Sequence, residues 1–469
     1  MIFTLLSTSL AILGVSAAQT TPVFAPPAAC PVCTSGNYTG QNNGSLPIQP
    51  RVSGKAYSRF IQIWLENTDF DTAQASSTFS KLASEGILLT NYNGVTHPSE
   101  PNYVASIAGD FFGMSDDNFY ALPPNVSTQI DLLEAHNVSW ASYQENMPYI
   151  GFSGDYAQKN YLDSSSKVPY TYYKRKHNPF IICDSIASVP ARMNRIRNFN
   201  DFAVDVNASA LPSWIFITPN LVNDAHDTNV TFVSAWLEYF LVPLLENPKF
   251  NDNETLILLT FDENEDYKSQ NTVYTLLLGG AVSPYKGTVD STFYTHYSSL
   301  SSVQNNWGLG SLGRQDTNST VASVFQFQAN MTNHTNVVSD ATPLMNLTGI
   351  FPGVCASQRW IPVTAPNMSV IGAGGGPVFT SNVTSNVSVD NTMPINLTAM
   401  RVVNPATINP NYTMPSSGTE VNAISTSASA SPSSSVAASS KSSAGYANAR
   451  LPPAMTTGLV CLFFTVLLL

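Results

Sequence analysis

Two nearly uninterrupted apolar runs, at residues 213–220 and 254–261, constrain the fold most. Each is as long as a β-strand and too apolar to leave one side in water, so both are predicted to be strands buried on both faces. Similar runs lie at 59–65, 138–143 and 273–278, and helical patterns at 72–86, 129–136 and 230–245 separate several of them. Strands that alternate with helices predict an α/β fold, with a doubly wound, mostly parallel sheet covered by helices on both faces.

Polar side chains follow three of the predicted strands. They form three clusters: Glu66 and Asn67, Asp224 and His226, and Asp262 and Glu263. The carboxyl ends of parallel strands meet at one edge of a sheet, and ligands bind there in open α/β folds. One acidic residue after a strand is commonly a turn residue or a helix cap, but three clusters at equivalent positions indicate a functional site.

Ser99 lies in a further polar segment, residues 96–103, at a junction between loop and helix. Residues 104–109 are predicted to form a short helix that ends at Gly109, with Pro101 in its first turn. The N-terminus of a helix favours an anion, and a serine hydroxyl beside a bound anion is what a covalent hydrolase of phosphate esters needs. The alternative is that Ser99 is only a helix cap.

The residue types in these clusters are those of a divalent metal site for hydrolysis. His296, in the polar segment 294–298, is a further candidate ligand, and the most basic short stretch, 170–180, contains Lys176 and His177. We therefore expect a divalent metal ion as cofactor, with its identity and number open.

The net charge of −11 and the lack of a basic stripe argue against nucleic acid as a partner, and the oligomeric state stays open.

The two ends of the chain read as sorting signals. The first 18 residues form an apolar run that ends in small residues, as in a secretory signal peptide. The last apolar run, 459–469, is too short to span a bilayer comfortably and follows small residues at 442–445, which fits a removable GPI-attachment signal. A short membrane tail is the alternative. A Ser/Ala-rich stretch before it predicts an extended stalk.

Glycan acceptors and cysteines agree with a secreted protein. The chain has sixteen Asn-x-Ser/Thr sites. Four of its five cysteines lie outside the C-terminal tail, at positions 30, 33, 183 and 355, and this even number predicts one or two disulfides. We interpret the Cys30 and Cys33 pair as structural rather than as a redox or zinc motif. Together these features predict secretion and GPI anchoring to the plasma membrane or cell wall.

Six motifs in a fixed order carry a resemblance to a known family: residues 66–70, 97–103, 176–180, 223–227, 261–263 and 296–298. Over about residues 59–312 the chain resembles the phosphoesterase family of fungal secreted acid phosphatases and bacterial phospholipase C enzymes, within the alkaline-phosphatase-like superfamily. The resemblance implies a doubly wound core, with a metal ion beside a serine or threonine nucleophile that forms a phosphoenzyme.

The resemblance also implies a role for each candidate residue. Metal ligands would be Glu66, Asn67, Asp262 and Glu263, with the Ser99 hydroxyl completing the set and also acting as nucleophile. Asn67 and Glu263 depart from the ligands of alkaline phosphatases, which leaves one metal ion or two. Asp224, His226 and His296 would form the rest of the catalytic group, the two histidines as phosphate contacts, proton donors or ligands of a second ion. Substrate phosphate would contact His97, Asn102, Lys176 and His177.

The resulting hypothesis is an extracellular acid phosphatase that hydrolyses phosphate monoesters. The alternatives are a phosphodiesterase of the phospholipase C type on the same fold and a non-catalytic, GPI-anchored wall glycoprotein. We divide the chain into a signal peptide (1–18), a Pro-rich leader (19–55), a phosphoesterase core (56–320), a β-rich C-terminal extension (321–414), a stalk (415–445) and a GPI-attachment signal (446–469).

Overall fold

The computed structural model describes residues 31, 40, 43–160, 162–163, 165–337, 353–355 and 365–379, and the backbone of 419–421. The chain divides into two units, 1–424 and 425–469. The predicted signal peptide, the GPI-attachment signal, Cys30 and Cys33 lie outside the described residues, as does nearly all of the predicted stalk. Among the described residues, no helix has the length and apolar character needed to cross a membrane.

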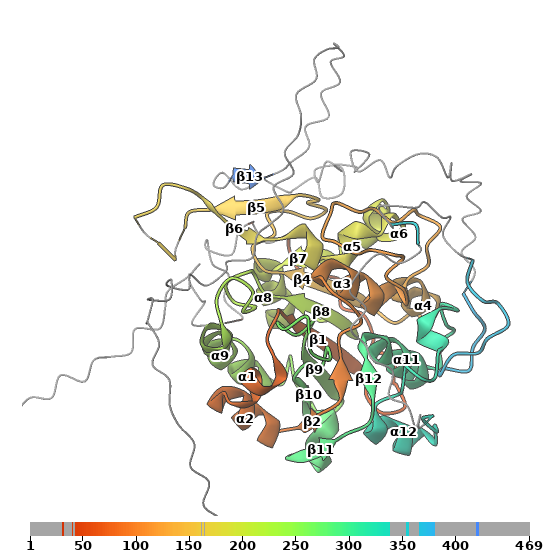
Figure 1. Ribbon diagram of the computed structural model, residues 1–469. Helices are drawn as coiled ribbons and strands as arrows, with labels where there is room; N and C mark the ends of the chain where they lie inside the picture. The colour runs from red at the N-terminus through yellow and green to blue at the C-terminus, as the bar shows by residue number, and fades with distance from the viewer. Residues whose placement is uncertain are drawn as a thin grey trace, which may run out of the picture. The chain divides into compact units, whose positions relative to one another are not determined.

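An eight-stranded sheet forms the centre of the first unit (Figure 1). Its order is β11 (Thr288–Asp290), β2 (Ile87–Leu89), β10 (Thr275–Leu278), β9 (Thr255–Phe261), β1 (Arg59–Leu65), β8 (Trp214–Thr218), β4 (Trp140–Gln144) and β7 (Ile196–Asn198). The strands from β9 to β7 are parallel. β10 follows β9 without an intervening helix and therefore returns antiparallel to it. The predicted mostly parallel α/β sheet is confirmed.

Strand β1 lies between β9 and β8, and every residue of β1 and β9 is buried. Side chains alternate between the two faces of the sheet, so the strands bury apolar groups on both sides. On one face, the Trp64 ring lies 5.1 Å from the Tyr103 ring of helix α3 (Ser99–Ala108). The Phe261 ring lies 5.6 Å from the ring of Phe79 in helix α2 (Ser77–Ser84).

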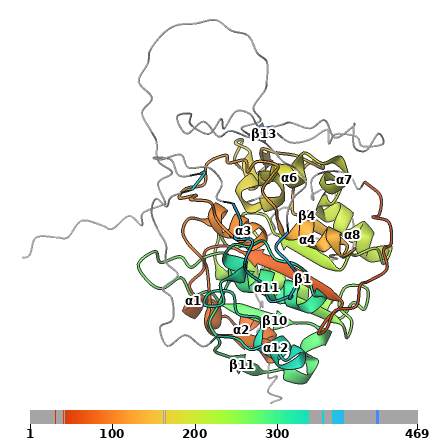
Figure 2. The same cartoon turned by 90° about the vertical axis from the view of Figure 1, so that its right-hand side faces the viewer.

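Helices cover both faces of the sheet, as Figures 1 and 2 show. One face carries α3 (Ser99–Ala108), α4 (Gln129–Ala135), α11 (His296–Trp307) and α12 (Gln326–Thr332); the other carries α2 (Ser77–Ser84), α8 (Phe199–Asn207) and α9 (Val230–Tyr239). The shorter helices are α1 (Phe70–Gln74), α5 (Pro179–Ile182), α6 (Asp184–Ala187), α7 (Pro190–Met193), α10 (Leu241–Leu245) and the 3-10 turns η1 (Arg175–His177), η2 (Gly280–Tyr285) and η3 (Gln315–Thr317).

Two small sheets complete the described strands. β12 (Tyr294–Thr295) pairs with β3 (Tyr92–Asn93), and β5 (Asp155–Gln158) lies between β6 (Tyr170–Tyr173) and β13 (Thr419–Val421). β12 and β3 lead the chain toward the carboxyl edge of the large sheet, because α11 and the segment that contains Ser99 follow them.

Two predicted helices are each split in two. The helix predicted over 72–86 forms α1 and α2, because Ser76 has an extended backbone and starts the second helix. The helix predicted over 230–245 forms α9 and α10. α9 ends at Tyr239, whose carbonyl the ring of Pro243 would otherwise meet, so the position of the break follows from the proline.

The C-terminal extension begins with a helix rather than strands. Residues 321–337 contain α12. Within the extension that we expected to be β-rich (321–414), Val378 forms a single β-bridge with Ser311. Residues 380–414 lie outside the described residues.

Two of the four cysteines expected to form disulfides lie among the described residues. Cys183 and Cys355 are buried and their thiols are free. The expectation that these two form a disulfide was therefore wrong, since a buried thiol also packs well as a small apolar side chain. A disulfide between Cys30 and Cys33 stays a prediction, because both lie outside the described residues.

Candidate active site

The three predicted clusters converge because their strands are neighbours in the sheet. Glu66 follows β1, Asp262 and Glu263 follow β9, and Asp224 lies in the loop after β8. Backbone hydrogen bonds continue past the strand ends: the N–H of Glu66 donates to the Asp224 carbonyl (2.9 Å), and the N–H of Asp262 donates to the Leu65 carbonyl (3.0 Å). The carboxyl edge of β9, β1 and β8 therefore presents carboxylates side by side.

Ser99 lies at the junction of loop and helix, as the sequence predicted, but α3 begins at Ser99 itself rather than at residue 104; it ends at Gly109, which has φ of +71°. The Oγ of Ser99 lies among oxygens of the kind that bind metal ions: 3.1 Å from Glu66 Oε2, 3.3 Å from Glu263 Oε1 and 3.5 Å from Asn67 Oδ1. The side chain of Asn67 also donates to Glu263 Oε1 (2.9 Å). The serine hydroxyl, one amide and two carboxylates thus meet at one point.

Asn102 holds the loop that precedes Ser99. Its Oδ1 accepts from the N–H groups of Val95 (2.8 Å) and Thr96 (3.1 Å), and its Nδ2 donates to the Thr96 carbonyl (2.7 Å). Nδ2 also lies 3.5 Å from Glu263 Oε2. Nδ2 donates to the Pro98 carbonyl as well (3.2 Å), so Asn102 mainly fixes the backbone of this loop and also contacts a candidate metal ligand.

Buried carboxylates dominate the electrostatics of the site. Glu66, Asp224, Asp262 and Glu263 are each 0% exposed. Burial, and then the charge of Glu263, raises the pKa of Asp262 to about 7. Burial, followed by the charge of Asp117, raises the pKa of Glu263 to about 8. Burial and the charges of Asp262 and Asp224 raise the pKa of Glu66 well above its usual value.

A bound cation would offset the repulsion between these buried carboxylates. Oδ2 of Asp262 and Oδ2 of Asp224 are buried without a hydrogen-bond partner, and a buried carboxylate oxygen in that state is costly. The donors are oxygens and one histidine, a set that suits a divalent ion. The residues present therefore fit the metal ion that the sequence predicted.

A second group of ligands shares Glu66. Glu66, His177 and Asp224 are buried and offer atoms that all lie within 4.8 Å of one another, so this group can hold a metal ion. His177 Nε2 lies 3.3 Å from Glu66 Oε1, and its Nδ1 lies 3.8 Å from Asp224 Oδ2. Burial and then the charge of Lys176 lower the pKa of His177, which keeps the imidazole neutral and able to act as a ligand.

Tyr103 supports this second group. Its hydroxyl donates to Glu66 Oε1, and its ring stacks on the ring of His177 at 5.1 Å. One residue of α3 thus positions both Glu66 and His177.

His226 is the most exposed of the candidate histidines. Its ring lies 6.0 Å from that of His177, and Nδ1 lies 2.6 Å from Asp227 Oδ1. Ala225, between Asp224 and His226, has φ of +92°, which is rare for a residue with a side chain and marks a backbone held by its surroundings. The turn directs the N–H of His226 to Asp224 Oδ1 (2.9 Å).

Lys176 lies at the rim of the site beside Asp117, with 2.9 Å between Nζ and Oδ2. Burial acts to lower the pKa of Lys176, but the charges of Asp117 and Glu66 outweigh it and hold the pKa above its usual value. The ammonium group is therefore charged and is already paired with a carboxylate.

His296 lies behind the carboxylates. Its Nε2 is 2.5 Å from the backbone carbonyl of Asp262, and its ring lies 4.4 Å from that of Trp64. Burial lowers its pKa to about 4, so the ring is neutral above that pH and donates from Nε2 to the carbonyl. The structure places His296 against the main chain of Asp262 rather than against its carboxylate.

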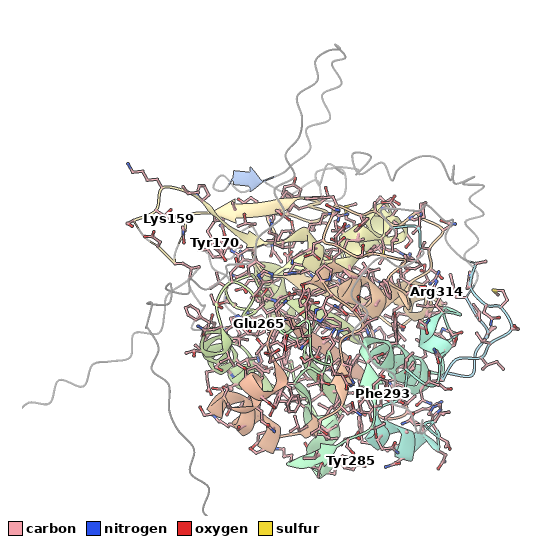
Figure 3. All side chains as sticks on the ribbon, in the orientation of Figure 1. Lys159, Tyr170, Glu265, Tyr285, Phe293 and Arg314 are labelled. Atoms are coloured by element: carbon pink, nitrogen blue, oxygen red, sulfur yellow. The ribbon has the colours of Figure 1, made fainter. Side chains whose placement is uncertain are left out.

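His97 contacts Glu263 from the other side of the site. Its Nδ1 lies 2.6 Å from Glu263 Oε2, and the ring of Tyr267, which is 45% exposed, stacks on it at 3.9 Å. Burial lowers the pKa of His97 to about 4. Figure 3 labels Glu265, which follows the β9 carboxylates in the sequence, and Tyr170 at the start of β6, whose hydroxyl donates to Asp227.

Sequence reasoning assigned no role to three residues of the site, Tyr103, Asp117 and Tyr267. Tyr103 lies within a motif used for the family resemblance and could have been considered. Asp117 and Tyr267 lie in irregular segments, without a periodic pattern that would place them.

A serine hydroxyl among buried carboxylates, at the carboxyl edge of a parallel α/β sheet, is the arrangement expected of a phosphate-ester hydrolase. Residues 47–310 match the phosphoesterase family. The chain belongs to this family, and the resemblance stated from the sequence is confirmed.

Two relatives and one solved structure show what the chain is similar to. It is 47% identical over 332 residues to a "Probable acid phosphatase" of Kluyveromyces lactis, covering 70% of this chain and 76% of the relative. It is 47% identical over 324 residues to an acid phosphatase of Aspergillus fumigatus, covering 68% and 70%. A protein of the alkaline phosphatase superfamily from Vibrio parahaemolyticus aligns over 61% of this chain and 71% of its own, with 10% identity and a TM-score of 0.34.

Proposed function

We propose that the protein is an extracellular acid phosphatase that hydrolyses phosphate monoesters through a phosphoserine at Ser99. The observation that carries the proposal is the position of the Ser99 hydroxyl, within 3.5 Å of Glu66, Asn67 and Glu263 at the N-terminus of α3. The matched family and the acid phosphatases among the relatives support this class of reaction.

A divalent ion would be held by Glu66, Asn67, Asp262, Glu263 and the Ser99 hydroxyl. When bound, it would lower the pKa of that hydroxyl and neutralise negative charge on the phosphoryl group. His97 and Asn102 orient Glu263, and His296 orients the main chain of Asp262. The group of Glu66, His177 and Asp224 is the proposed place for a second ion, which a count of bound metal per chain would test.

In the first step, Ser99 Oγ passes its proton to Glu66, to which it donates a hydrogen bond, and attacks phosphorus, so that a new P–O bond forms while the bond to the leaving alcohol breaks. His226, exposed at the edge of the site, is the proposed donor of a proton to the departing oxygen. Lys176 and the N-terminus of α3 are the proposed contacts of the phosphoryl oxygens. In the second step, water attacks phosphoserine and gives one proton to His226, while the proton held by Glu66 returns to Ser99 as phosphate is released.

The proposed location is outside the cell, with a GPI anchor to the plasma membrane or wall. The terminal segments of the sequence support it, and so does the exposure of glycan-acceptor residues in the described part of the chain: Asn137, Asn207, Asn229, Asn253, Asn318 and Asn330. A test is expression in a eukaryotic host, followed by treatment with an N-glycosidase and with a phosphatidylinositol-specific phospholipase. A protein that loses no mass with the first and is not released by the second would contradict this location.

Hydrolysis of matched substrates tests the reaction. A chromogenic phosphate monoester and its diester would be compared across acid and neutral pH, with added divalent metal and with chelator. Faster monoester hydrolysis at acid pH, lost with chelator, is expected. Diester hydrolysis alone would indicate the phospholipase C type of phosphodiesterase instead. No hydrolysis of either substrate by folded, metal-supplied protein would favour the non-catalytic wall glycoprotein.

A further inference from the structure

We infer that Asp117 is an internal competitor of the substrate, a carboxylate that occupies the phosphate position beside Ser99 until a phosphoryl group displaces it. The inference rests on the proposed function, because that function requires phosphate to bind at this place. Two contacts carry it. Oδ1 of Asp117 accepts from the backbone N–H of Glu100 (3.0 Å), and Oδ2 lies 2.9 Å from Nζ of Lys176.

The two partners of Asp117 are the groups that a phosphoryl group on Ser99 would use. Glu100 directly follows Ser99, and its N–H lies in the first turn of the ten-residue helix α3, where amides have no partner within the helix. The N-cap residue, Pro98, provides no side-chain cap for them. Lys176 is the charged ammonium group at the rim of the site. A backbone amide and an ammonium group around one oxyanion form a phosphate-binding arrangement, and the Asp117 carboxylate fills it.

Asp117 also increases the electrostatic repulsion in the site. After burial, its charge is the next cause that raises the pKa of Glu263, and it also acts to raise the pKa of Glu100. A carboxylate that crowds other carboxylates gains only from its contacts with Lys176 and the helix N-terminus. Phosphate would make the same contacts with more charge, so the two anions compete for one place.

The position of Asp117 allows it to leave. It lies in a segment without helix or strand between Met114 and Leu122, and its side chain is 29% exposed. Rotation of the side chain into water would free both donors without breaking a helix or a strand.

The opposite role for Asp117 would be to orient Lys176 toward phosphate. The two roles predict effects of opposite sign on phosphate affinity. If Asp117 competes with phosphate, its neutralisation strengthens binding. If it orients Lys176, its neutralisation weakens binding.

The experiment is calorimetric titration of the metal-loaded, full-length protein with inorganic phosphate at one fixed pH. Ser99→Ala would be compared with Ser99→Ala/Asp117→Asn, so that no covalent step contributes. We expect the Kd for phosphate to fall by about tenfold on neutralisation of Asp117, the scale of one charge-assisted hydrogen bond. An unchanged or higher Kd would overturn the inference, and so would absence of phosphate binding in both proteins.

Asp116→Asn is the matched control. Asp116 is adjacent, but it accepts hydrogen bonds from Asn118 and Tyr120 of its own segment. Its neutralisation should leave the Kd unchanged; an equal fall would indicate a general charge effect and overturn the inference. Asp117→Ser provides a second variant if Asp117→Asn folds poorly. Tighter phosphate binding without monoester hydrolysis by wild type would refute the proposed function alone, whereas hydrolysis without tighter binding would refute this inference alone.

Discussion

The hydroxyl of Ser99 lies 3.1 Å from Oε2 of Glu66, although the two residues come from the start of a helix and the end of a strand. The contact exists because β1 lies at the centre of the sheet and α3 packs over it, with Tyr103 against Trp64. The same packing brings the Tyr103 hydroxyl to the other oxygen of Glu66. One carboxylate therefore connects the proposed nucleophile with the second group of ligands.

Replacement of Ser99 by alanine should abolish catalysis without unfolding the protein. We expect kcat to fall by at least about a thousandfold, because loss of a nucleophile removes the covalent step. Ser106→Ala is the matched control, since Ser106 lies on the same helix and its hydroxyl donates to the Tyr103 carbonyl. Steady-state kinetics and thermal unfolding of both variants check this. Equal losses of activity in the two variants would show that the effect is structural.

Replacement of Asp262 by asparagine should have opposite effects with and without metal. Without metal, the variant should be more stable than wild type, because one of four crowded carboxylates is removed. With metal, it should gain much less stability than wild type, since a ligand is lost and ligand binding stabilises only the folded state. Thermal unfolding in chelator and in excess divalent metal measures both effects. A metal-induced shift as large as that of wild type would exclude Asp262 as a ligand.

The role proposed for His296 can be separated from acid catalysis by two substitutions. Its Nε2 donates to the Asp262 carbonyl, and its pKa of about 4 leaves it neutral over most of the acid range. His296→Gln retains a donor, whereas His296→Phe retains only a ring. We expect the phenylalanine variant to lose metal affinity or activity by about ten- to a hundredfold, with a smaller loss for glutamine. Equal losses in both variants would argue against the hydrogen bond.

Stability should fall as the pH rises, and Glu145 should contribute to the fall. Burial raises its pKa from 4.5 to about 7, against the hydrogen bonds from the Asn220 N–H and the Asn223 side chain. The folded protein therefore holds the proton more tightly than the unfolded chain does, and the free energy of unfolding decreases between pH 4.5 and about 7. The shift corresponds to at most about 3 kcal/mol.

Denaturant unfolding in chelator, at pH values below and above this window, measures the contribution of Glu145. In Glu145→Gln the difference between the two pH values should be smaller than in wild type by about 2 to 3 kcal/mol. The comparison does not depend on the absolute stability of the variant. A difference as large as that of wild type would show that Glu145 does not hold its proton in the folded protein.

Much of the fold and of the site composition could be predicted from the sequence, for identifiable reasons. The runs that became β1, β8 and β9 are apolar throughout, and in a buried parallel sheet such runs can end in polar residues only at the edge. Glu66, Asp224 and Asp262 were therefore expected to lie together. The end of α3 at Gly109 was predicted from the glycine, whereas the helix begins at Ser99, five residues before the predicted start.

The sequence could not show which atom each residue presents. His296 was a candidate for the catalytic group, but α11 begins at that residue and aims its ring at the Asp262 carbonyl. Asn102 was a candidate for substrate binding, yet its amide holds the backbone at Val95 and Thr96. Asp117 reaches Lys176 from an irregular segment, which no periodicity predicts. The catalytic and binding roles of the site residues stay predictions that the experiments above test.

The central claim is that Ser99 carries the phosphoryl group during turnover. The most direct measurement is mass spectrometry of peptides from protein that is mixed with a phosphate monoester and metal, then quenched in acid during turnover. We predict one added phosphoryl group on the peptide that contains Ser99, and none in Ser99→Ala. Turnover of the monoester by Ser99→Ala at the wild-type rate, with no phosphoryl group on the wild-type peptide, would contradict the account.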